Sequence, residues 1–385
     1  MRIQLWSYNY DPEPQGIAPL SGVVARALAQ RGHEVVVVAA HPHYPEPVWG
    51  RRRRPYRERR DGLRVLRLPL WIGRGSGVER VRQELSFAAS QAMVAPILPA
   101  CDALIAVSPC FPALAVAMGF SRARGVPWVQ WLQDIVTDAA ASTGLLDEGP
   151  LLRAARAFER RTYASADRVI VISEAFRENL RAKGVAEEKL VRIFNPMTRD
   201  LPPTTQPERV DGPPRLLAMG NIGYSQGLDG IVEAFEASAD LARLDARLVI
   251  AGHGVEAEAV RARIRTERVL MRGVLLDGAL DAELRGAQLG VVSQRADVAE
   301  FNLPSKLMNY MAYGLPVLAS VRPESETARI VRDSGGGWVC DACDPAAFAR
   351  TAAEVLARPD VLGERRAAAR AFAERNFRPA DVARR

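Results

Sequence analysis

The residues best suited to chemistry in this 385-residue chain surround one of its three lysines. Pro304-Ser305-Lys306 stands directly before a helical pattern that runs from Leu307 to Ala312, and Gly314 follows it. The first N–H groups of a helix have no partner within the helix and carry partial positive charge. The chain otherwise uses arginine, 49 times, so a lysine here suggests a need for a compact ammonium group. The pattern is typical of a site that binds an anion.

Glycine-rich turns that follow predicted strands are the second chemical feature. Gly220-Asn221-Ile222-Gly223 comes after a strand predicted at 215–219, and Gly252-His253-Gly254 comes after one at 246–252. Gly16 stands between the first predicted strand and the first helix. Glycine lets backbone N–H groups approach a phosphate or a sugar, although each turn alone could also be only a tight turn. The first turn lacks the GxGxxG spacing, which argues against a nicotinamide or flavin site.

The elements that must position these residues alternate between strand and helix. The segment EVVVVAA at 34–40 is an uninterrupted apolar run, as expected of a parallel strand that is buried on both faces. Helical patterns such as 18–30, 151–164 and 174–182 separate the strands. This order predicts an α/β fold with doubly wound parallel sheets. The predicted strands are 3–8, 34–40, 63–70, 102–107, 126–132 and 167–173, then 215–219, 246–252, 288–293 and 316–320.

Prolines interrupt the alternation between 196 and 214, where six of them occur. That density excludes a continuous helix or central strand and indicates a linker. We therefore expect an N-terminal Rossmann-like domain at 1–200 and a C-terminal one at 201–365, facing each other across a cleft. Residues 366–385 are expected to form a helix that packs back on the N-terminal domain. Ligands of such sheets bind beyond the carboxyl ends of the strands, where the glycine turns lie.

Composition limits the classes of protein that fit. Hydrophobic residues make up 48% and charged residues 25% of the chain, as in an ordinary globular protein. Four cysteines are too few for a disulfide scaffold, and the pair Cys340 and Cys343 lacks the further ligands of a zinc site. The N-terminus has no signal-peptide pattern, and no stretch is long and apolar enough to span a membrane. We therefore expect a cytoplasmic protein without a metal.

Several segments together resemble glycosyltransferase family 4. They are Gly32–Val35, Val191–Pro196, the GNIGxxQGL segment at 220–228, the turn Ala251–Gly254, and PSKLMNYMAYGLPV at 304–317. The resemblance covers essentially the whole chain, is carried mainly by 219–228 and 304–317, and is closest to the bacterial polysaccharide branch of colanic-acid and O-antigen transferases. It implies a GT-B fold and transfer of a sugar from a nucleotide donor, with retention at the anomeric carbon and no obligatory metal.

The resemblance also implies roles for individual residues. Asp134 and Lys306 are expected to be catalytic: Asp134 would orient the acceptor hydroxyl or the sugar, and Lys306 would meet the diphosphate. The residues expected to bind the donor follow strands or open helices, and they are Gly16, Gly220, Asn221, Gly223, Gln226, His253, Gly254, Arg272, Gly273, Ser305 and Asn309. Gly16 would cover the diphosphate and sugar, and the turn at 272–273 would line the base.

The chain departs from the family pattern at several of these positions. Many family members carry an arginine and a lysine near the diphosphate, where this chain has Tyr224 and Gln226. Two glutamates that are spaced eight apart in the family fall here on Phe301 and Asn309, and Glu300 is one residue out of register. An asparagine could still hydrogen-bond a ribose hydroxyl. Lys306 and the helix end are then expected to neutralise more of the leaving diphosphate.

The expected function is that of a retaining glycosyltransferase of the hexosyltransferase type, acting in the synthesis of cell-surface polysaccharide or glycolipid. A UDP-sugar donor is favoured over a GDP-sugar, and no cofactor is expected because the nucleotide sugar is a substrate. Two alternatives stay open. One is a nucleotide-sugar epimerase of the same architecture, and the other is a catalytically inactive protein that binds nucleotide sugars.

The basic character of the chain is concentrated at residues 51–82, which hold 12 basic and 3 acidic side chains against a net charge of +7 for the whole chain. No nucleic-acid motif accompanies them, so no nucleic-acid partner is expected. The segment is either a solvated loop or a peripheral contact with an anionic membrane, with help from Trp71, Ile72 and Phe87, that brings the enzyme to a lipid-linked acceptor. The low-charge stretch that follows, 85–121, predicts helix, buried strand and helix, or alternatively a face that dips into a bilayer.

Overall fold

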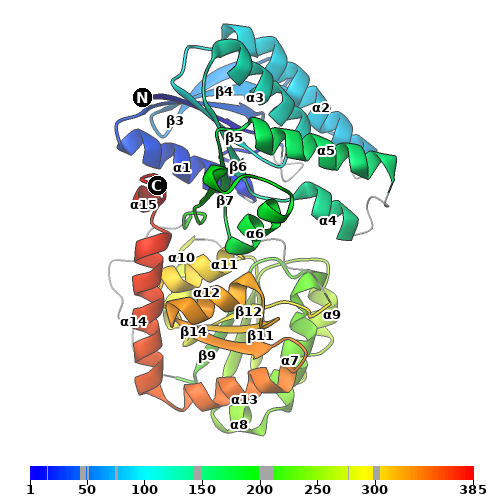
Figure 1. Ribbon diagram of the computed structural model, residues 1–385. Helices are drawn as coiled ribbons and strands as arrows, with labels where there is room; N and C mark the ends of the chain where they lie inside the picture. The colour runs from blue at the N-terminus through cyan, green and yellow to red at the C-terminus, as the bar shows by residue number, and fades with distance from the viewer. Residues whose placement is uncertain are drawn as a thin grey trace. The chain divides into compact units, whose positions relative to one another are not determined.

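The chain divides into two compact units. Unit 1 comprises Met1–Thr198 and Pro379–Arg385, and unit 2 comprises Arg199–Arg378. This computed structural model describes residues 1–14, 16–43, 49, 52–73, 77–142, 149–198, 212–275, 277–297 and 304–385. Most of the predicted linker, 199–211, lies outside the described residues. Each unit is an α/β layer structure (Figure 1). Unit 1 is drawn in blue to green, together with the red C-terminal α15, and unit 2 in yellow-green to red.

Unit 1 is built on an eight-stranded sheet in the order β3-β4-β2-β1-β5-β6-β7-β8. All neighbouring strands are parallel except β3, which pairs antiparallel with β4 at one edge. The strands are β1 (Arg2–Ser7), β2 (Glu34–Ala40), β3 (Tyr56–Arg60), β4 (Leu63–Leu68), β5 (Ala103–Val107), β6 (Trp128–Leu132), β7 (Arg168–Val171) and β8 (Leu190–Arg192).

Helices cover both faces of this sheet, because alternate residues of each central strand point to opposite sides. Leu5 and Val37 pack with Leu20, whereas Trp6 and Val38 belong to a second core. The helices are α1 (Ile17–Gln30), α2 (Gly77–Val94), α3 (Phe111–Arg124), α4 (Val136–Ser142), α5 (Pro150–Ser165), α6 (Glu174–Ala182) and α15 (Pro379–Val382), with short 3-10 turns at Ala95–Ile97 and Glu187–Lys189.

Part of the basic segment is a β-hairpin rather than a solvated loop. Residues 56–60 alternate between exposed and half-buried side chains as β3 pairs with β4. Arg67 on β4 is fully buried, and nothing in the sequence pattern predicted this. Its guanidinium lies 2.8 Å from Glu58, donates to the carbonyls of Ala40 and Asp11, and stacks on the Tyr10 ring. The count of 12 basic residues therefore overstates the exposed charge. Arg51 and 74–76 lie outside the described residues.

Unit 2 is built on a six-stranded parallel sheet in the order β11-β10-β9-β12-β13-β14. Its strands are β9 (Arg215–Met219), β10 (Arg247–Ala251), β11 (Val269–Gly273), β12 (Leu289–Ser293), β13 (Val317–Val321) and β14 (Gly337–Asp341). Its helices are α7 (Leu228–Ala237), α8 (Ala239–Arg243), α9 (Ala257–Arg261), α10 (Asp277–Gly286), α11 (Ser305–Ala312), α12 (Glu326–Ser334), α13 (Pro345–Leu356) and α14 (Pro359–Asn376), with a 3-10 turn at Tyr224–Gln226.

The helices of unit 2 form two groups, and the strand order explains this division. β9 to β11 run outward from the centre in one direction and β12 to β14 in the other, so the connections diverge at β9 and β12. α13 packs on α7 and α8, whereas α14 packs on α11 and α12 (Figure 1). The doubly wound organisation predicted from the sequence is confirmed in both units.

The prediction for the C-terminal tail was partly wrong. Residues 366–378 belong to unit 2, because α14 buries Leu362, Ala369 and Ala373 within that unit. Only Pro379–Arg385 join unit 1, where α15 packs on α1 and Val382 enters the core. None of the helices in the described parts of the chain is long and apolar enough to cross a membrane.

The buried Arg67 provides a test of this packing. We expect Arg67→Met to lower the free energy of unfolding of unit 1 by about 2–3 kcal/mol, because it leaves Glu58 and buried carbonyls without their charged donor. Five of the six tryptophans lie in residues 1–198, so urea unfolding followed by tryptophan fluorescence reports on this unit. Arg64→Met, in the same strand but with its side chain 54% exposed, is the control. Equal unfolding midpoints for the two variants would contradict the buried role of Arg67.

Candidate active site

Helix α11 opens at the carboxyl edge of the unit 2 sheet without a side-chain cap. Pro304 is its N-cap residue, Ser305 is exposed at the first helical position, and Lys306 follows. The backbone N–H groups of this first turn have no partner inside the helix, and they carry the positive end of the helix dipole. The predicted helix is thus confirmed, although it begins at Ser305, two residues before the predicted Leu307, and its open end can accept an anion.

Lys306 is the most unusual group at this edge, since it is only 8% exposed. Its Nζ donates to Oε1 of Gln226, and its Cε lies 3.8 Å from where a side chain on Gly220 would begin. Burial lowers the pKa of Lys306 to about 8. Among the described residues no carboxylate forms an ion pair with it; Glu300 and Phe301, two positions of the family comparison, lie outside them. A buried ammonium without an anionic partner is a candidate for binding an anionic ligand.

Tyr310, one helical turn beyond Lys306, fixes α11 on the sheet. Its hydroxyl donates to the Leu217 carbonyl and accepts from the Met219 N–H, both at 2.9 Å. Gly290 on β12 makes room for the ring, because a Cβ there would lie 2.6 Å from it. Sequence reasoning missed this contact; the only signal was a tyrosine four positions after the lysine. Tyr310 therefore fixes the position of Lys306 relative to the end of β9.

The two glycine turns of unit 2 are interlocked. The Gly220 N–H donates to the Ala251 carbonyl at 2.9 Å, and the Ile222 N–H donates to the His253 carbonyl at 3.0 Å. A Cβ on Gly252 would lie 1.8 Å from the Gly220 carbonyl oxygen, and one on Gly254 would lie 2.2 Å from that of Ile222. Glycine at 252 and 254 is therefore required for the turns to pack, independently of any ligand.

Strand register places the predicted binding residues along one edge. Met219 pairs with Ala251, and Ala251 pairs with Gly273, so the three strands β9, β10 and β11 end side by side. Arg272 and Gly273 are the last residues of β11 rather than part of a separate turn. Arg272 is exposed, with its Nε 3.7 Å from Glu283, and His253 is exposed as well.

Two amides complete the predicted set on unit 2. Asn309 is half-buried on α11, and its Oδ1 has no hydrogen-bond partner among the described residues. Asn221 folds back over its own turn, because its Nδ2 lies 2.8 Å from where a side chain on Gly223 would begin. The Oδ1 atom of Asn309 is thus buried without a partner in the described part of the chain, and its binding to a ligand hydroxyl stays a prediction.

A second cation that sequence reasoning missed lies on the neighbouring loop. Arg295 places its guanidinium 4.3 Å above the Tyr224 ring and lies 3.2 Å from Asp297, which also accepts from the Tyr224 hydroxyl at 3.1 Å. Hydrogen bonding to Arg295 lowers the pKa of Asp297. Tyr224, which stands where family members have an arginine, thus supports an arginine from another loop. No motif in the sequence linked positions 224 and 295.

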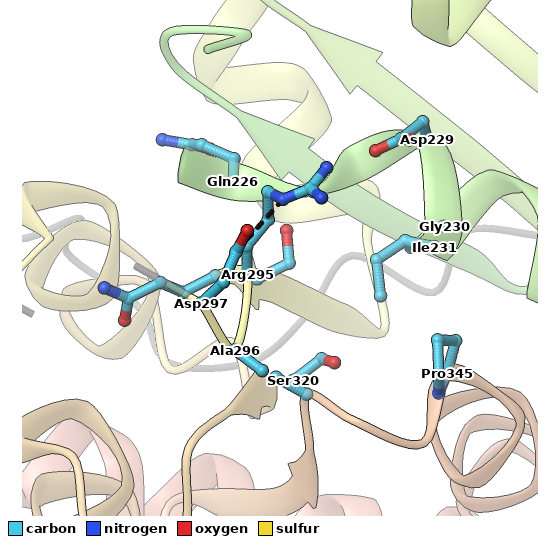
Figure 2. Close-up of a pocket in the computed structure, with 13 residues that line it drawn as sticks. Gln226, Asp229, Gly230, Ile231, Arg295, Ala296, Asp297, Ser320 and Pro345 are labelled. Atoms are coloured by element: carbon cyan, nitrogen blue, oxygen red, sulfur yellow. Dashed lines mark hydrogen bonds and ion pairs between the residues drawn. The ribbon is translucent and has the colours of Figure 1, made fainter. Parts of the chain in front are cut away.

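Arg295 also lines a pocket of about 360 Å³ beside Lys306. Figure 2 shows the pocket between the first turn of α7 and the loop after β12, with Ser320 near the end of β13 and Pro345 at the start of α13. Gln226, the partner of Lys306, belongs to the wall of this pocket. The lysine and the pocket are therefore joined through one side chain.

The other two predicted residues belong to unit 1. Gly16 is the exposed N-cap residue of α1, with a φ of 65° that favours glycine. Asp134 follows β6 and is half-buried; burial raises its pKa, and its Oδ1 has no hydrogen-bond partner among the described residues. The structure thus groups the predicted residues by unit, with Gly16 and Asp134 on unit 1 and the rest on unit 2.

No group of three His, Cys, Asp or Glu side chains in the described part of the chain is placed to hold a metal ion. Cys340 is buried with its Sγ 3.4 Å from the Thr351 hydroxyl, and Cys343 is exposed.

Both units match known families of glycosyltransferases. Residues 15–196 match the glycosyl transferase 4-like domain, and residues 213–358 match the glycosyl transferases group 1. The chain is 28% identical over 361 residues to the putative colanic acid biosynthesis glycosyl transferase WcaI of Escherichia coli, covering 88% of each chain. It is 29% identical over 336 residues to the GDP-mannose-dependent alpha-mannosyltransferase of Mycolicibacterium smegmatis, covering 83% of this chain and 79% of the other.

Solved structures share the fold at lower identity. Anabaena HepE, in a complex with UDP, superimposes with a TM-score of 0.69 at 14% identity and covers 100% of this chain and 98% of its own. WaaG, a glycosyltransferase involved in lipopolysaccharide biosynthesis, gives a TM-score of 0.64 at 16% identity, with 99% and 98% covered. The fold of each unit, the edge that gathers the predicted residues, and the two family matches lead to one conclusion: the chain belongs to the family 4 type of glycosyltransferases and has the GT-B fold.

Proposed function

We propose that this glycosyltransferase moves a sugar from a nucleoside-diphosphate sugar to an acceptor hydroxyl, with retention at the anomeric carbon, in the synthesis of cell-surface polysaccharide or glycolipid. The observation that carries the proposal is the buried Lys306 ammonium, which has no carboxylate partner among the described residues and lies at the open end of α11 beside the Gly220 turn. A diphosphate is the anion that such a site fits best.

The chemistry of the leaving group explains the arrangement. When the bond from the anomeric carbon to the diphosphate breaks, negative charge grows on the phosphate oxygens. Lys306 and the N–H groups of α11 are already positioned to stabilise that charge, so little reorganisation is needed at the transition state. Arg295, held on Tyr224, supplies a second cation within the neighbouring pocket wall. Fixed cations of this kind stabilise the leaving diphosphate as a metal ion does in other enzymes. We propose that this enzyme needs no metal ion.

We propose a UDP-sugar rather than a GDP-sugar as the donor. HepE, which shares the fold, has been crystallised with UDP and with UDP-glucose. The Mycolicibacterium relative uses GDP-mannose, so guanosine is the runner-up. We assign Asn309, with its unpaired oxygen, to a ribose hydroxyl of the nucleotide.

We assign the acceptor to unit 1, where Asp134 would orient its hydroxyl. Burial raises the pKa of this carboxyl, and an unpaired oxygen is free to accept a hydrogen bond. The acceptor that we propose is linked to a lipid, and the enzyme would work in the cytoplasm at the inner face of the membrane. The exposed arginines of the basic segment, Arg52, Arg53, Arg54, Arg57 and Arg59, would attract anionic lipid headgroups.

A thermal-shift panel of nucleoside diphosphates tests the donor site. UDP is expected to raise the midpoint of thermal unfolding more than GDP, ADP or inorganic phosphate, because a ligand that binds only the folded state stabilises it by mass action. EDTA should leave the shift unchanged. An equal response to all nucleotides would remove the uridine preference, and no response to any of them would contradict the donor site itself.

Lys306→Met tests the cation directly. We expect kcat to fall 100-fold or more, since one preorganised donor to a developing oxyanion is worth about 3–4 kcal/mol. Lys189→Met, which changes a lysine that contacts backbone carbonyls on unit 1, is the matched control. Sugar transfer by the Lys306 variant within threefold of wild type would refute the assignment.

The same lysine predicts a pH dependence with a definite sign. Lys306 loses its proton as the pH rises through about 8 in the free protein, whereas a bound diphosphate favours the charged form. The dissociation constant of UDP should therefore rise above pH 8 in wild type and stay flat to higher pH in Lys306→Arg. Isothermal titration calorimetry at pH 7 to 10 measures both, and parallel curves for the two proteins would rule out Lys306 as the titrating group.

Flotation with liposomes tests the membrane contact. Vesicles of POPC with 30% POPG should carry the wild-type protein at low salt, and pure POPC vesicles should not. The triple change of Arg52, Arg53 and Arg54 to Ser should abolish flotation, whereas the same change at Arg261, Arg263 and Arg265, exposed on unit 2, should not. Equal flotation of both triple variants would show that the basic segment plays no part.

A further inference from the structure

We propose that a groove between α2, α3 and α5 on unit 1 binds the apolar chain of a lipid-linked acceptor, and that Arg80 at the end of the groove holds the anionic head of that lipid beside Asp134. The proposal rests on the function proposed above, and it names a binding site for the acceptor on side chains that no family motif of the sequence marks.

The groove is almost purely apolar and is open to solvent. It has a volume of about 520 Å³, and every residue that lines it is apolar. The main contributors are Leu85, Ala89 and Ala92 on α2, Phe111 and Val116 on α3, and Phe158 on α5. The Phe111 and Phe158 rings pack at 5.5 Å, and the small alanines of α2 leave the groove open. An apolar groove that is open to solvent is costly in free energy, and it is typical of a surface that a hydrophobic partner covers.

Large apolar side chains continue along α2 and beyond it. Leu85 is 52% exposed, Met93 is 72% exposed, and Ile97, in the turn that follows α2, is 76% exposed. Low sequence charge over 85–121 predicted either buried elements or a bilayer-facing surface. The predicted order of helix, buried strand and helix is confirmed by α2, β5 and α3. The exposed apolar side chains of α2 leave the bilayer-facing alternative as a hypothesis.

The helices around the groove carry a net positive charge. α2 holds Glu79 and Glu84 against Arg80 and Arg82, so the excess comes from α3 and α5. α3 carries Arg122 and Arg124 and no acidic residue, and the one acidic residue of α5, Glu159, is 2% exposed and paired with Lys183. Arg153, Arg160 and Arg161 are exposed on α5. An apolar groove with a basic rim is complementary to a molecule that has an apolar chain and an anionic head.

One end of the groove meets the carboxyl edge of the unit 1 sheet. Phe111 is the first residue of α3 and follows the end of β5 closely, while Leu85 stands one position after Glu84 on α2. Arg80, one turn earlier, has a side chain that is 71% exposed and lies 3.2 Å from Glu84. Asp134 follows β6, which is the neighbour of β5 in the sheet, so it lies at the same sheet edge as the start of α3. The Phe111 end of the groove and the predicted acceptor residue therefore share the carboxyl edge of the unit 1 sheet.

Unpaired polar atoms at this end point independently to a ligand. Ser108, after β5, is 1% exposed, and its hydroxyl has no hydrogen-bond partner among the described residues; the same holds for Oδ1 of Asp134, after the neighbouring strand β6. Buried polar atoms normally find partners, so two orphans at adjacent strand ends indicate a place for a polar group. The hydroxyl groups of an acceptor sugar, carried by an amphiphile whose chain lies in the groove, would reach them.

The test uses the full-length protein and geranylgeranyl phosphate as the probe, below its critical micelle concentration, with geranylgeraniol and inorganic phosphate as comparisons. Calorimetry should show binding of the probe, at least tenfold weaker in Ala89→Glu because a carboxylate would enter the groove. Ala367→Glu, at an exposed alanine inside α14, should bind as wild type does. Arg80→Gln should weaken the phosphate probe at least fivefold and leave geranylgeraniol unchanged.

Three outcomes would overturn the proposal. If Ala89→Glu bound the probe as tightly as wild type, the groove would not be the binding site. If inorganic phosphate bound as tightly as the probe, the apolar chain of the probe would contribute nothing to binding. Loss of flotation on POPC/POPG vesicles in Ala89→Glu, without any binding of the probe, would make the groove a face that docks on the bilayer instead. The UDP thermal shift of Ala89→Glu should equal that of wild type, so failure of the donor site is seen separately.

Discussion

The buried ammonium of Lys306 is the constraint around which unit 2 is arranged. A pKa lowered from 10.5 to about 8 means that keeping the charge costs the folded protein about 3 kcal/mol near neutral pH. Stability from this group is therefore gained, not lost, as the pH rises from 8 towards 10.5, and an anion that binds beside the lysine relieves the same cost. A site that is unfavourable when empty is well suited to a diphosphate that carries its own negative charge.

Contacts around Lys306 fix its position. Tyr310 fixes α11 on the last residues of β9, and Gly290 gives its ring the room to do so. The turn that begins at Gly220 is bonded to the next turn so closely that Gly252 cannot be replaced without a clash. A rigid edge of this kind keeps the helix end and the glycine turn at a constant separation, which is what preorganised stabilisation of a leaving group requires.

The sequence predicted most of this architecture, because buried parallel strands read as continuous apolar runs and a lysine beside an open helix end has few structural uses. It missed β3, whose YRERR segment has no apolar alternation, and β8, which has only three residues. It also missed β11 and β14, in which an arginine or an aspartate interrupts the apolar run. The Tyr310 clamp, the stacking of Arg295 on Tyr224 and the burial of Arg67 were also missed. Each of these depends on residues far apart in the chain, so only packing could reveal it. Phe301, at which the family pattern departs most, lies outside the described residues.

The most direct measurement of the central claim is the pKa of the Lys306 ammonium itself. The chain has only three lysines, so nitrogen-detected NMR of the side-chain NH₃⁺ groups gives three resonances, and Lys306→Arg identifies one of them. We expect a Lys306 pKa of about 8 in the free protein, rising by more than one unit when UDP binds. An ordinary pKa near 10.5 in the free protein, or one that UDP leaves unchanged, would contradict it.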